Sequence, residues 1–325
     1  MHIALIYSKY EDLDASITEF NPHGPTQMNN TILSIKEVLE TNDHQVTSLE
    51  ADNDLLTNLE KIETPDLLFN LSTGISDKRS QANIVGMLEM TKIPMVGSGL
   101  TSHVLGLHKE ITKSLLSAHG IRTAPSQLVS DKNEKIREDF TYPLVVKPEH
   151  EGTGIGITDS SKVENPKQLR NIIHEKIDLH NQVLLIEEFL PGREFTIGVL
   201  GNSILEIFPI EEIIFIKDGP QMLTGKLKTE DDIDSEIPAN ISEELKEEIE
   251  SMVKKTFRIL RCQDFARIDI RLDRDGKPNV IELNTFPGLE KGVSYFPILG
   301  EAAGYSYNEL INRLVEISME PKALQ

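Results

Sequence analysis

Two carboxylates and a side-chain amide are expected to meet on one face of a hairpin near the C-terminus. The segment ARIDIRLDRDGKPNVIELN, residues 266–284, has two alternating runs around Asp275-Gly276, a pair that favours a tight β-turn. A two-residue turn would place residue 269 opposite 282 and residue 267 opposite 284. One face would then carry Arg267, Asp269, Glu282 and Asn284, and the other Ile268, Ile270, Ile281 and Leu283.

This polar face has the ligand types of a magnesium site. Carboxylates that lie directly opposite each other across a ladder repel and destabilise the strand pair. A divalent cation would remove that repulsion, and Asp, Glu and Asn offer the oxygen ligands that Mg²⁺ prefers. The alternative is a solvated face on which Arg267 neutralises the two carboxylates without a metal.

A lysine followed by a glycine-rich run forms a second candidate site. In VVKPEHEGTGIGI, residues 145–157, Lys147 precedes the three glycines Gly152, Gly154 and Gly156. This order is the reverse of a Walker A loop, and the helix that a Walker A loop or a dinucleotide fingerprint requires is not predicted to follow. Ile155 and Ile157 continue a strand-like alternation, so we expect two strands joined by a glycine loop that holds phosphate. A glycine-rich hairpin without a ligand is the alternative, but a phosphate loop and a metal face in one chain favour nucleotide phosphate chemistry.

The elements that must position these sites begin with a parallel α/β unit. Apolar runs predict strands over residues 3–7, 44–49, 66–70 and 94–96, and helical periodicity predicts helices over residues 28–41 and 80–90. Such alternation favours a small, mostly parallel sheet. We therefore expect a Rossmann-like α/β domain over residues 1–98 and an overall α/β fold class, with an α+β arrangement in the rest of the chain.

Two further units follow. Residues 99–187 predict a helix over 103–119, the Lys147 strand with its hairpin, a helix over 166–177 and a strand over 183–186. Residues 188–325 predict strands over 194–200 and 204–210, a helix over 242–260 and the hairpin around Asp275-Gly276. The polar segment 217–238, which contains Lys226, is expected to be a mobile loop.

Composition limits the class of protein. The 325 residues are 38% hydrophobic and 26% charged, as in a soluble globular protein, and the net charge of -20 disfavours nucleic acid and anionic membranes as partners. Cys262 is the only cysteine, which excludes an internal disulfide framework and a multi-cysteine metal site. The apolar run after Met1 is short for a signal peptide, and no apolar stretch approaches the roughly 18 residues of a membrane span, so we expect a cytoplasmic protein.

Several segments, in order along the chain, resemble the ATP-grasp superfamily and within it the D-alanine–D-alanine ligase family. They are residues 95–99, Lys109, and residues 142–156, 187–200 and 267–297. The run EEFLPGREFT, residues 187–196, resembles the family's interdomain hinge. The resemblance implies a central ATP-grasp subdomain over 99–187 and a C-terminal one over 188–325, with antiparallel sheets that clamp ATP.

The same resemblance implies a role for each matching residue. The ATP phosphates would be contacted by Lys109, Lys147, Lys226 and the loop residues Gly152, Thr153 and Gly154. Adenine would be held by Glu187 and the following Glu188, Phe189 and Leu190, and ribose by Glu194. The Mg²⁺ ligands would be Asp269, Glu282 and Asn284, with two ions expected and Mn²⁺ as a substitute.

Three residues would act on the reacting atoms. The resemblance implies that Arg267 and the backbone of Gly288 stabilise the oxyanion of a tetrahedral intermediate. It also implies that Ser294 binds the carboxylate of the attacking amino acid, and that the protein forms a homodimer. The expected reaction joins a small-molecule carboxylic acid and an amine through an acyl phosphate, with release of ADP and phosphate.

The segments that would bind the amino acids depart from the family's pattern. Where the family has Gly-Gly-Ser-x-Glu, this chain has YSKYE at residues 7–11, and the family's Leu-His-Gly is replaced within NLSTGISD at residues 70–77. The Ser-Ser of the glycine loop is Thr153-Gly154, and a Tyr after the lid lysine is Leu227. An altered pocket would be lined by Ser72 and Thr73, with Asp77, Lys78 and Arg79 as further candidates. We therefore expect a pair of substrates other than two D-alanines.

Two alternatives remain beside this carboxylate–amine ligase. The first is a divergent D-alanine–D-alanine ligase of cell-wall synthesis. The second, from another class, is a nucleotide-binding regulatory protein that has lost catalysis. Retention of Arg267 together with the three metal-ligand residues argues against the second, because a binding protein needs no oxyanion donor.

Overall fold

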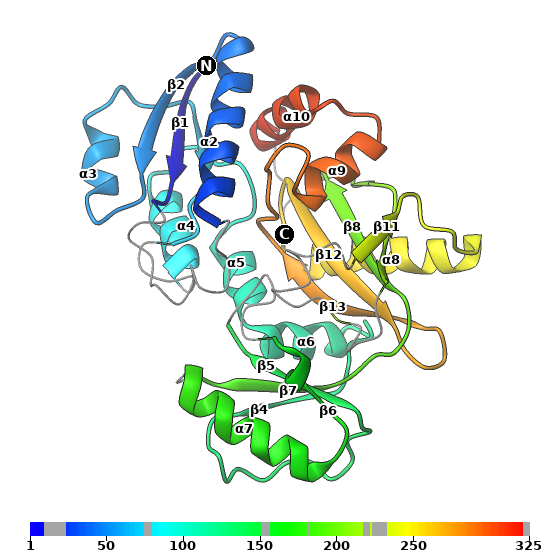
Figure 1. The fold of residues 1–325 in the computed structure, drawn as a ribbon. Helices are drawn as coiled ribbons and strands as arrows, with labels where there is room; N and C mark the ends of the chain where they lie inside the picture. The colour runs from blue at the N-terminus through cyan, green and yellow to red at the C-terminus, as the bar shows by residue number, and fades with distance from the viewer. Residues whose placement is uncertain are drawn as a thin grey trace.

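The chain folds around three sheets that follow one another along the sequence (Figure 1). The computed structural model describes residues 1–9, 24–74, 80–150, 157–180, 182–216, 222 and 233–320. Within these residues the strand orders are β2-β1-β3, β4-β7-β5-β6 and β11-β10-β8-β12-β13, with β9 paired to β8.

The first sheet is parallel, as the sequence predicts. Its strands are β1 (His2–Tyr7), β2 (Gln45–Glu50) and β3 (Leu67–Asn70), and its helices are α2 (Gly24–Thr41), α3 (Leu55–Glu60) and α4 (Gln81–Met90). Ile3 and Leu5 of β1 pack into one core and Ala4 and Ile6 into another, so this strand is buried on both faces, as parallel strands usually are. The short strand predicted at 94–96 is a single parallel bridge between Met95 and Leu68.

The second sheet is antiparallel and is covered on one face by a helix. After α5 (Leu100–Leu107) and α6 (Lys109–Ala118) come β4 (Ser126–Val129), β5 (Leu144–Pro148), the 3₁₀ turn Asp159–Ser161, β6 (Lys162–Val163), α7 (Pro166–His180) and β7 (Leu184–Glu188). Leu144 and Val146 pack into the core beneath α7. Because side chains alternate along a strand, Val145 and Lys147 point to the opposite face.

The third sheet repeats this arrangement. It contains β8 (Glu194–Leu200), β9 (Glu206–Ile207), β10 (Glu211–Phe215), β11 (Ile233–Glu236), β12 (Phe265–Leu272) and β13 (Pro278–Asn284), with α8 (Glu243–Ile259) between β11 and β12. Ile268 and Ile270 pack with residues of α8 in one apolar core. The alternation therefore turns Arg267 and Asp269 of β12 away from α8.

The C-terminal helices join the last part of the chain to the first. Helix α10 (Tyr307–Met319), which follows α9 (Tyr295–Ala302), packs against α2 beside the first sheet (Figure 1). Ile3 of β1 shares one hydrophobic core with Phe265 of β12 and Phe296 of α9. The division of the chain into domains at 1–98, 99–187 and 188–325 stays a proposal. Strand β7 extends one residue past the second boundary.

The single helix predicted over 103–119 is wrong, because the structure has two helices that meet at His108. This residue has φ -99° and ψ 84°, outside the helical range. Helix α6 begins immediately after it, and the carboxylate Oε1 of Glu149 accepts the backbone N–H of Glu110 at 3.0 Å. A group from another strand thus satisfies one of the N–H groups that a helix start leaves unpaired.

The strand predicted over 204–210 is also wrong. The structure has the two-residue strand β9 and then a separate strand, β10, that starts at Glu211. Pro209 lies between them and has no N–H to donate to a ladder. Phe208 is fully buried against β8, where a Cβ on Gly198 would lie 2.5 Å from its Cδ2.

The hairpin around Asp275-Gly276 forms, but its turn is one residue longer than predicted. Asp273 pairs with Lys277 through a backbone hydrogen bond of 2.9 Å, which leaves a three-residue turn with Gly276 at φ +73°. The ladder pairs Ile270 with Val280, not with the predicted Ile281, and the register shifts after Asp269. This β-bulge restores the predicted pairing of Asp269 with Glu282 and of Arg267 with Asn284.

Two expected loops lie only partly within the described residues. The second strand of the glycine hairpin is β6, which pairs with Leu144 and Val145, whereas the predicted continuation at Ile157 is irregular. Within segment 217–238, residues 233–236 form β11 beside β10, so that part is not a loop. Residues 217–221 and 223–232, which include Lys226, lie outside the described residues, as do 151–156. None of the helices described here has the length and apolar character needed to cross a membrane.

Candidate active site

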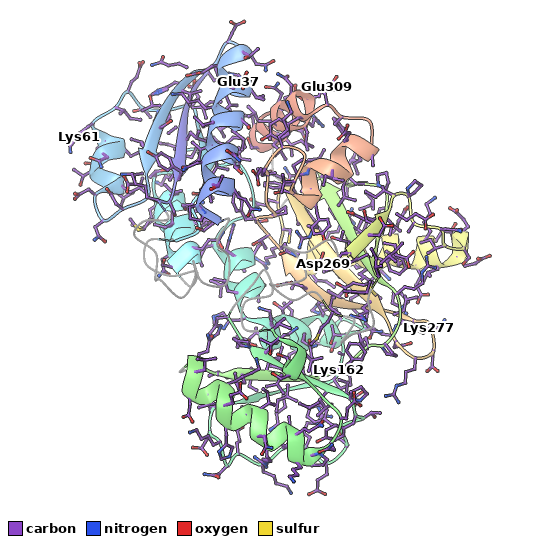
Figure 2. All side chains as sticks on the ribbon, in the orientation of Figure 1. Glu37, Lys61, Lys162, Asp269, Lys277 and Glu309 are labelled. Atoms are coloured by element: carbon purple, nitrogen blue, oxygen red, sulfur yellow. The ribbon has the colours of Figure 1, made fainter. Side chains whose placement is uncertain are left out.

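Four polar side chains form a row across the third sheet. Glu211 of β10 pairs with Thr196 of β8, Thr196 pairs with Asp269 of β12, and Asp269 pairs with Glu282 of β13. The row lies on the face turned away from α8. Figure 2 shows Asp269 near the centre of the molecule, on the third sheet.

Asp269 is buried and holds its neighbours in place. Its Oδ1 accepts hydrogen bonds from Thr196 Oγ1 at 2.6 Å and Arg267 Nε at 3.0 Å. Its Oδ2 accepts from Arg267 Nη2 and from Asn284 Nδ2, both at 3.0 Å. Both oxygens are therefore already bonded, and a cation at this carboxylate would have to replace at least one of these donors.

The donor set itself fits Mg²⁺. Asp269, Glu282 and Asn284 offer carboxylate and amide oxygens, and the ladder register brings them onto one face of two adjacent strands. Glu282 and Asn284 also line one pocket together with Lys109. These three residues are the ones that would hold the ion.

Arg267 is buried beside the row and is permanently charged. Burial would lower the pKa of the guanidinium, but the adjacent Asp269 outweighs this effect and raises the pKa above its usual range. The guanidinium also lies 5.3 Å from the ring centroid of Tyr295, which adds a cation–π contact. Its planar donors are thus fixed in orientation, as an electrostatic catalyst requires.

The lysine at the start of α6 lines the same pocket as two of the predicted metal ligands. Lys109 lines a pocket with Glu282, Asn284, His103 and His150. Its Nζ donates to the backbone oxygen of Glu149 at 3.1 Å. Burial lowers the pKa of His103 to about 4, so the imidazole of this pocket residue is uncharged at pH 7. A cationic side chain and oxygen ligands from distant parts of the sequence therefore meet in one cavity.

Lys147 and Glu187, predicted as phosphate and adenine contacts, are brought together on the second sheet. The Nζ of Lys147 lies 2.5 Å from Glu187 Oε1, and Lys113 of α6 binds Oε2 at 2.6 Å. Burial alone would raise the pKa of Glu187, but the two lysines outweigh it and lower the pKa to about 2. The carboxylate is therefore ionised and shared between two cations.

The chain after Glu187 forms the link to the third sheet. The N–H groups of Glu188 and Phe189 donate to Pro125 O and Pro143 O, both at 3.0 Å. Phe189 and Leu190 are buried, and Phe189 packs with Val145 and Met222 in a small apolar cluster. This cluster lies beside the ion pair, because Val145 is the ladder partner of Glu187.

Glu194, the predicted ribose contact, forms a buried ion pair within the third sheet. Its Oε2 accepts a hydrogen bond of 2.9 Å from Arg271 Nη1. Burial lowers the pKa of Arg271, and the carboxylate opposes that shift. Arg271 also stacks on Phe189, 4.7 Å from the ring centroid. The pair thus ties the linking segment to the sheet.

Gly288 and Ser294 lie side by side after β13. A Cβ on Gly288 would stand 2.6 Å from Ser294 Oγ. Ser294 Oγ accepts the backbone N–H of Glu290 at 3.1 Å. Glu290 is buried, and Asn30 of α2 donates to its Oε1 at 2.8 Å. Two of the three residues predicted to act on the reacting atoms, Gly288 and Ser294, are therefore adjacent, and Asn30 from the first part of the chain binds Glu290 beside them.

Ser72, one of the residues predicted to line the substrate pocket, has its side chain in the protein interior. Ser72 is fully buried and its hydroxyl donates to Asn70 Oδ1 at 2.7 Å. The N–H of Thr73 donates to Ser8 Oγ at 3.1 Å, which ties this turn to the end of β1. Several other predicted site residues lie outside the described residues: Gly152, Thr153, Gly154, Lys226, Asp77, Lys78 and Arg79.

Three residues of the site were not predicted from the sequence. Lys113 follows Lys109 by one helical turn, so the spacing of four residues places both on one face of a helix. Thr196 lies two residues after Glu194 in β8 and shares its face. Glu211 has no such indicator, because its strand could not be placed from the pattern. Burial raises the pKa of Glu211 to about 7.

The match to known families decides the identity of this site. The family model described as "D-ala D-ala ligase C-terminus" matches residues 116–316, which contain the row of polar residues, Arg267, Lys147 and Glu187. The chain belongs to the D-alanine–D-alanine ligase family. As a member of this family it is an ATP-dependent ligase that forms a peptide bond, built on the ATP-grasp fold.

Individual relatives agree with this assignment. The chain is 32% identical over 294 residues to the uncharacterized protein y4sG of Sinorhizobium fredii, covering 88% of this chain and 86% of that protein. It is 32% identical over 250 residues to a D-alanine–D-alanine ligase of Pelotomaculum thermopropionicum, covering 73% of this chain and 76% of that enzyme.

Solved structures show the same fold at lower identity. A D-alanine–D-alanine ligase from Bacillus anthracis superposes with a TM-score of 0.77 at 23% identity, covering 98% of this chain and 97% of the other. The VanG D-Ala:D-Ser ligase of Enterococcus faecalis gives a TM-score of 0.76 at 22% identity, covering 98% and 99%. The predicted arrangement of an α/β part followed by two antiparallel sheets is thereby confirmed.

Proposed function

We propose that the protein is an ADP-forming carboxylate–amine ligase that joins amino acids, or an amino-acid-like acid and amine, other than two D-alanines. The observation that carries the ligase reaction is the pocket shared by Lys109, Glu282 and Asn284. A cationic side chain and oxygen atoms of the types that bind Mg²⁺ line one pocket, and this combination supports the proposal because phosphoryl transfer uses both.

The remaining residues have roles that agree with this chemistry. The carboxylate substrate would attack the γ-phosphate of ATP, and the amine would then attack the acyl phosphate and release phosphate. Mg²⁺ bound at Asp269, Glu282 and Asn284 would supply positive charge to the phosphate oxygens. Arg267 is fixed by two hydrogen bonds to Asp269 and provides a permanent charge for the oxyanion, together with the backbone of Gly288.

The nucleotide would bind between the second and third sheets. Val145, Phe189 and Met222 offer an apolar surface for the adenine ring beside Glu187. Lys147 would contact the phosphates, and Lys113 would keep Glu187 ionised when Lys147 turns to the nucleotide. Glu194 would bind ribose from its position next to Arg271.

Residues in the first part of the chain support substrates other than two D-alanines. Residues 7–11 replace the family's Gly-Gly-Ser-x-Glu turn. The hydroxyl of Ser72 donates to Asn70 Oδ1 and is therefore not directed into a cavity. Ser8 is also used within the protein, because its Oγ donates to Gly74 O at 2.6 Å. These internal hydrogen bonds leave fewer groups for D-alanine and support a different acid.

Release of ADP over a panel of acids and amines tests the proposal. The purified protein would be incubated with Mg²⁺-ATP and L- and D-amino acids, singly and in pairs, and the products analysed by mass spectrometry. We expect a condensed product and stoichiometric ADP from a pair other than two D-alanines. An Asp269→Ala, Glu282→Ala double variant should abolish both.

The two alternatives give different results in the same assay. Efficient formation of the D-alanine dipeptide would show a divergent D-alanine–D-alanine ligase and refute the proposed substrate choice. Tight ATP binding without acid-dependent ADP release for any pair, after the panel is extended to larger natural-product acids, would support a regulatory nucleotide-binding protein.

A further inference from the structure

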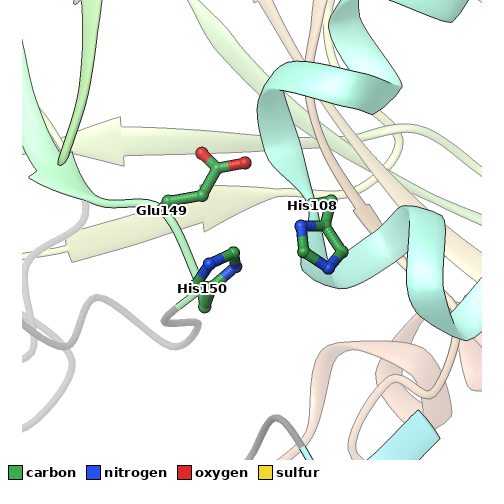
Figure 3. Close-up of side chains that lie close together, drawn as sticks. All are labelled: His108, Glu149 and His150. Atoms are coloured by element: carbon green, nitrogen blue, oxygen red, sulfur yellow. The ribbon is translucent and has the colours of Figure 1, made fainter. Parts of the chain in front are cut away.

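Two histidines and a buried glutamate converge beside the pocket, outside the predicted Mg²⁺ set. His108 lies at the junction of α5 and α6, and Glu149 and His150 directly follow β5 (Figure 3). One potential ligand atom from each of these three side chains lies within 4.8 Å of the other two. The two imidazole rings are 4.7 Å apart between centroids and nearly perpendicular.

Glu149 carries an oxygen that the described protein atoms leave unsatisfied. The residue is only 2% exposed, and its Oε1 accepts the N–H of Glu110. Its Oε2 is buried and has no hydrogen-bond partner within the described part of the chain. Leaving a buried carboxylate oxygen without a donor or a cation is costly. An ion bound at Oε2 would remove this cost.

The charged groups around the cluster do not already neutralise Glu149. The ammonium of Lys109 is hydrogen-bonded to the backbone oxygen of Glu149. Lys147 is paired with Glu187. Burial raises the pKa of Glu149, against the opposing effect of these lysines. The carboxylate thus lacks a direct ionic partner within the described residues.

We propose that His108, Glu149 and His150 form a binding site for a divalent transition-metal ion of the zinc type. Zinc accepts a set of two imidazoles and one carboxylate, whereas Mg²⁺ prefers oxygen ligands and disfavours the two imidazoles. Zinc bonds of about 2.0–2.1 Å bring tetrahedral ligand atoms to roughly 3.3 Å from one another. The ligand atoms, which lie within 4.8 Å of one another, would therefore approach one another by up to about 1.5 Å on binding, through rotation of the half-buried imidazoles.

The proposed zinc site adjoins the residues proposed for the ligase reaction. His150 lines the same pocket as Lys109, Glu282 and Asn284. Three protein ligands leave a fourth position for water or an anionic oxygen. The ion would also connect the start of α6 to the end of β5, the two elements that supply Lys109 and Lys147. Metal binding itself does not depend on the proposed ligase reaction.

Metal binding to the full chain tests the site. The protein would be stripped with a chelator and dialysed against micromolar Zn²⁺ in millimolar MgCl₂, so that oxygen-ligand sites are saturated with Mg²⁺. We expect one Zn²⁺ per chain that withstands the Mg²⁺ excess. The affinity should fall at least about 10- to 100-fold in the His108→Gln and His150→Gln variants.

Matched variants distinguish zinc binding at this site from zinc binding by histidines elsewhere in the protein. His119 and His174 are exposed and lie outside the cluster, so His119→Gln and His174→Gln should leave zinc binding unchanged. Glu149→Gln retains an acceptor for the Glu110 N–H and should bind zinc more weakly with the fold intact. Unchanged zinc stoichiometry and affinity in the His108→Gln, His150→Gln double variant would overturn the proposal.

Two readouts on the unaltered protein remain valid if a variant fails to fold. Co²⁺ should give d–d absorption without a thiolate charge-transfer band, because Cys262 is buried in another core. Zn²⁺ should shift the imidazole ¹⁵N resonances of two histidines only. A thiolate band, or shifts spread over the exposed histidines, would refute the site, as would the absence of saturable binding in the micromolar range.

Discussion

Glu187 and Lys113 form a buried ion pair, with 2.6 Å between Oε2 and Nζ and side-chain exposures of 10% and 6%. Lys147 binds the other carboxylate oxygen of Glu187. One negative charge thus holds two lysines from α6 and β5 in place. This pairing fixes the distance between the two elements that supply Lys109 and Lys147 to the proposed phosphate site.

We predict that Glu187→Gln lowers the free energy of unfolding by about 3 kcal/mol, because it leaves two buried ammonium groups without a counter-charge. Urea unfolding at pH 7 measures this change. The matched control is Glu248→Gln, which breaks the ion pair with Arg122 at side-chain exposures of 36% and 43%. An exposed pair should cost less than about 1 kcal/mol, and equal losses in both variants would contradict the role of burial.

The contribution of Glu187 should also depend on pH. The folded pKa is about 2, below the ordinary 4.5, so the stabilisation is complete above about pH 5 and is lost as the pH falls from 4.5 towards 2. The difference in unfolding free energy between wild type and Glu187→Gln should be about 1 kcal/mol smaller at pH 4 than at pH 7. Urea titrations at both pH values measure it. A difference that grows on acidification would show that the sign is wrong.

Asp269→Asn and Glu282→Gln should each lower kcat/KM for ADP release by at least about 100-fold, because each removes a negative ligand from the proposed Mg²⁺ set. Steady-state assays over a range of Mg²⁺ concentrations should show a higher Mg²⁺ requirement. Asp275→Asn is the control, since Asp275 is exposed in the turn of the same hairpin. Full activity in Asp269→Asn would exclude this carboxylate as a ligand.

Arg267→Lys should lower kcat roughly 100-fold with little change in KM for ATP, because a lysine cannot reproduce the two-point contact with Asp269 or aim the same donors at an oxyanion. Initial rates at saturating acid and amine give both constants. Arg313→Lys, at an exposed pair with Glu316, should leave the rate unchanged. If KM for ATP rises and kcat is unaffected, Arg267 serves nucleotide binding instead.

Gly288→Ala should lower kcat/KM for the amine about 10-fold, because the new Cβ would collide with Ser294 Oγ. Ser294→Ala alone should also weaken the reaction by loss of a hydroxyl. The double variant should lose less than the sum of both, with a coupling of about 1 kcal/mol, because the collision is relieved. Strict additivity in this double-mutant cycle would show that the two residues do not act on one substrate group.

Helices and strands could be predicted from the sequence where their own residues show the hydrophobic periodicity of that element. The first parallel sheet, α8 and the strands that carry Asp269 and Glu282 were predicted within a few residues. The break at His108 could not be predicted, because the group that caps α6 is Glu149, which is distant in sequence. Helix α10 was missed as well, since its apolar face is explained only by its packing on α2.

The candidate site shows the same limit. The pairing of Asp269 with Glu282 was predicted correctly although the turn length was wrong, because the bulge at Ile281 compensates for the longer turn. Glu211 joins the row only through the order of strands in the sheet, and the spacing of Lys113 from Lys109 indicates a shared helix face but not the contact with Glu187. Strand order and contacts between distant segments depend on the whole fold, so a local pattern does not contain them.

Because of the bulge, β13 could lose one residue without a change in its pairing with β12. Ile281 is the one residue between Val280 and Glu282 without a partner on β12. A gene that lost the codon for Ile281 would encode a regular ladder in which Asp269 still faces Glu282 and Ile270 still faces Val280. Loss of Leu283 would instead shift Asn284 to the opposite face. Relatives of this chain can therefore differ in length at position 281 without a change in the residues that face the pocket.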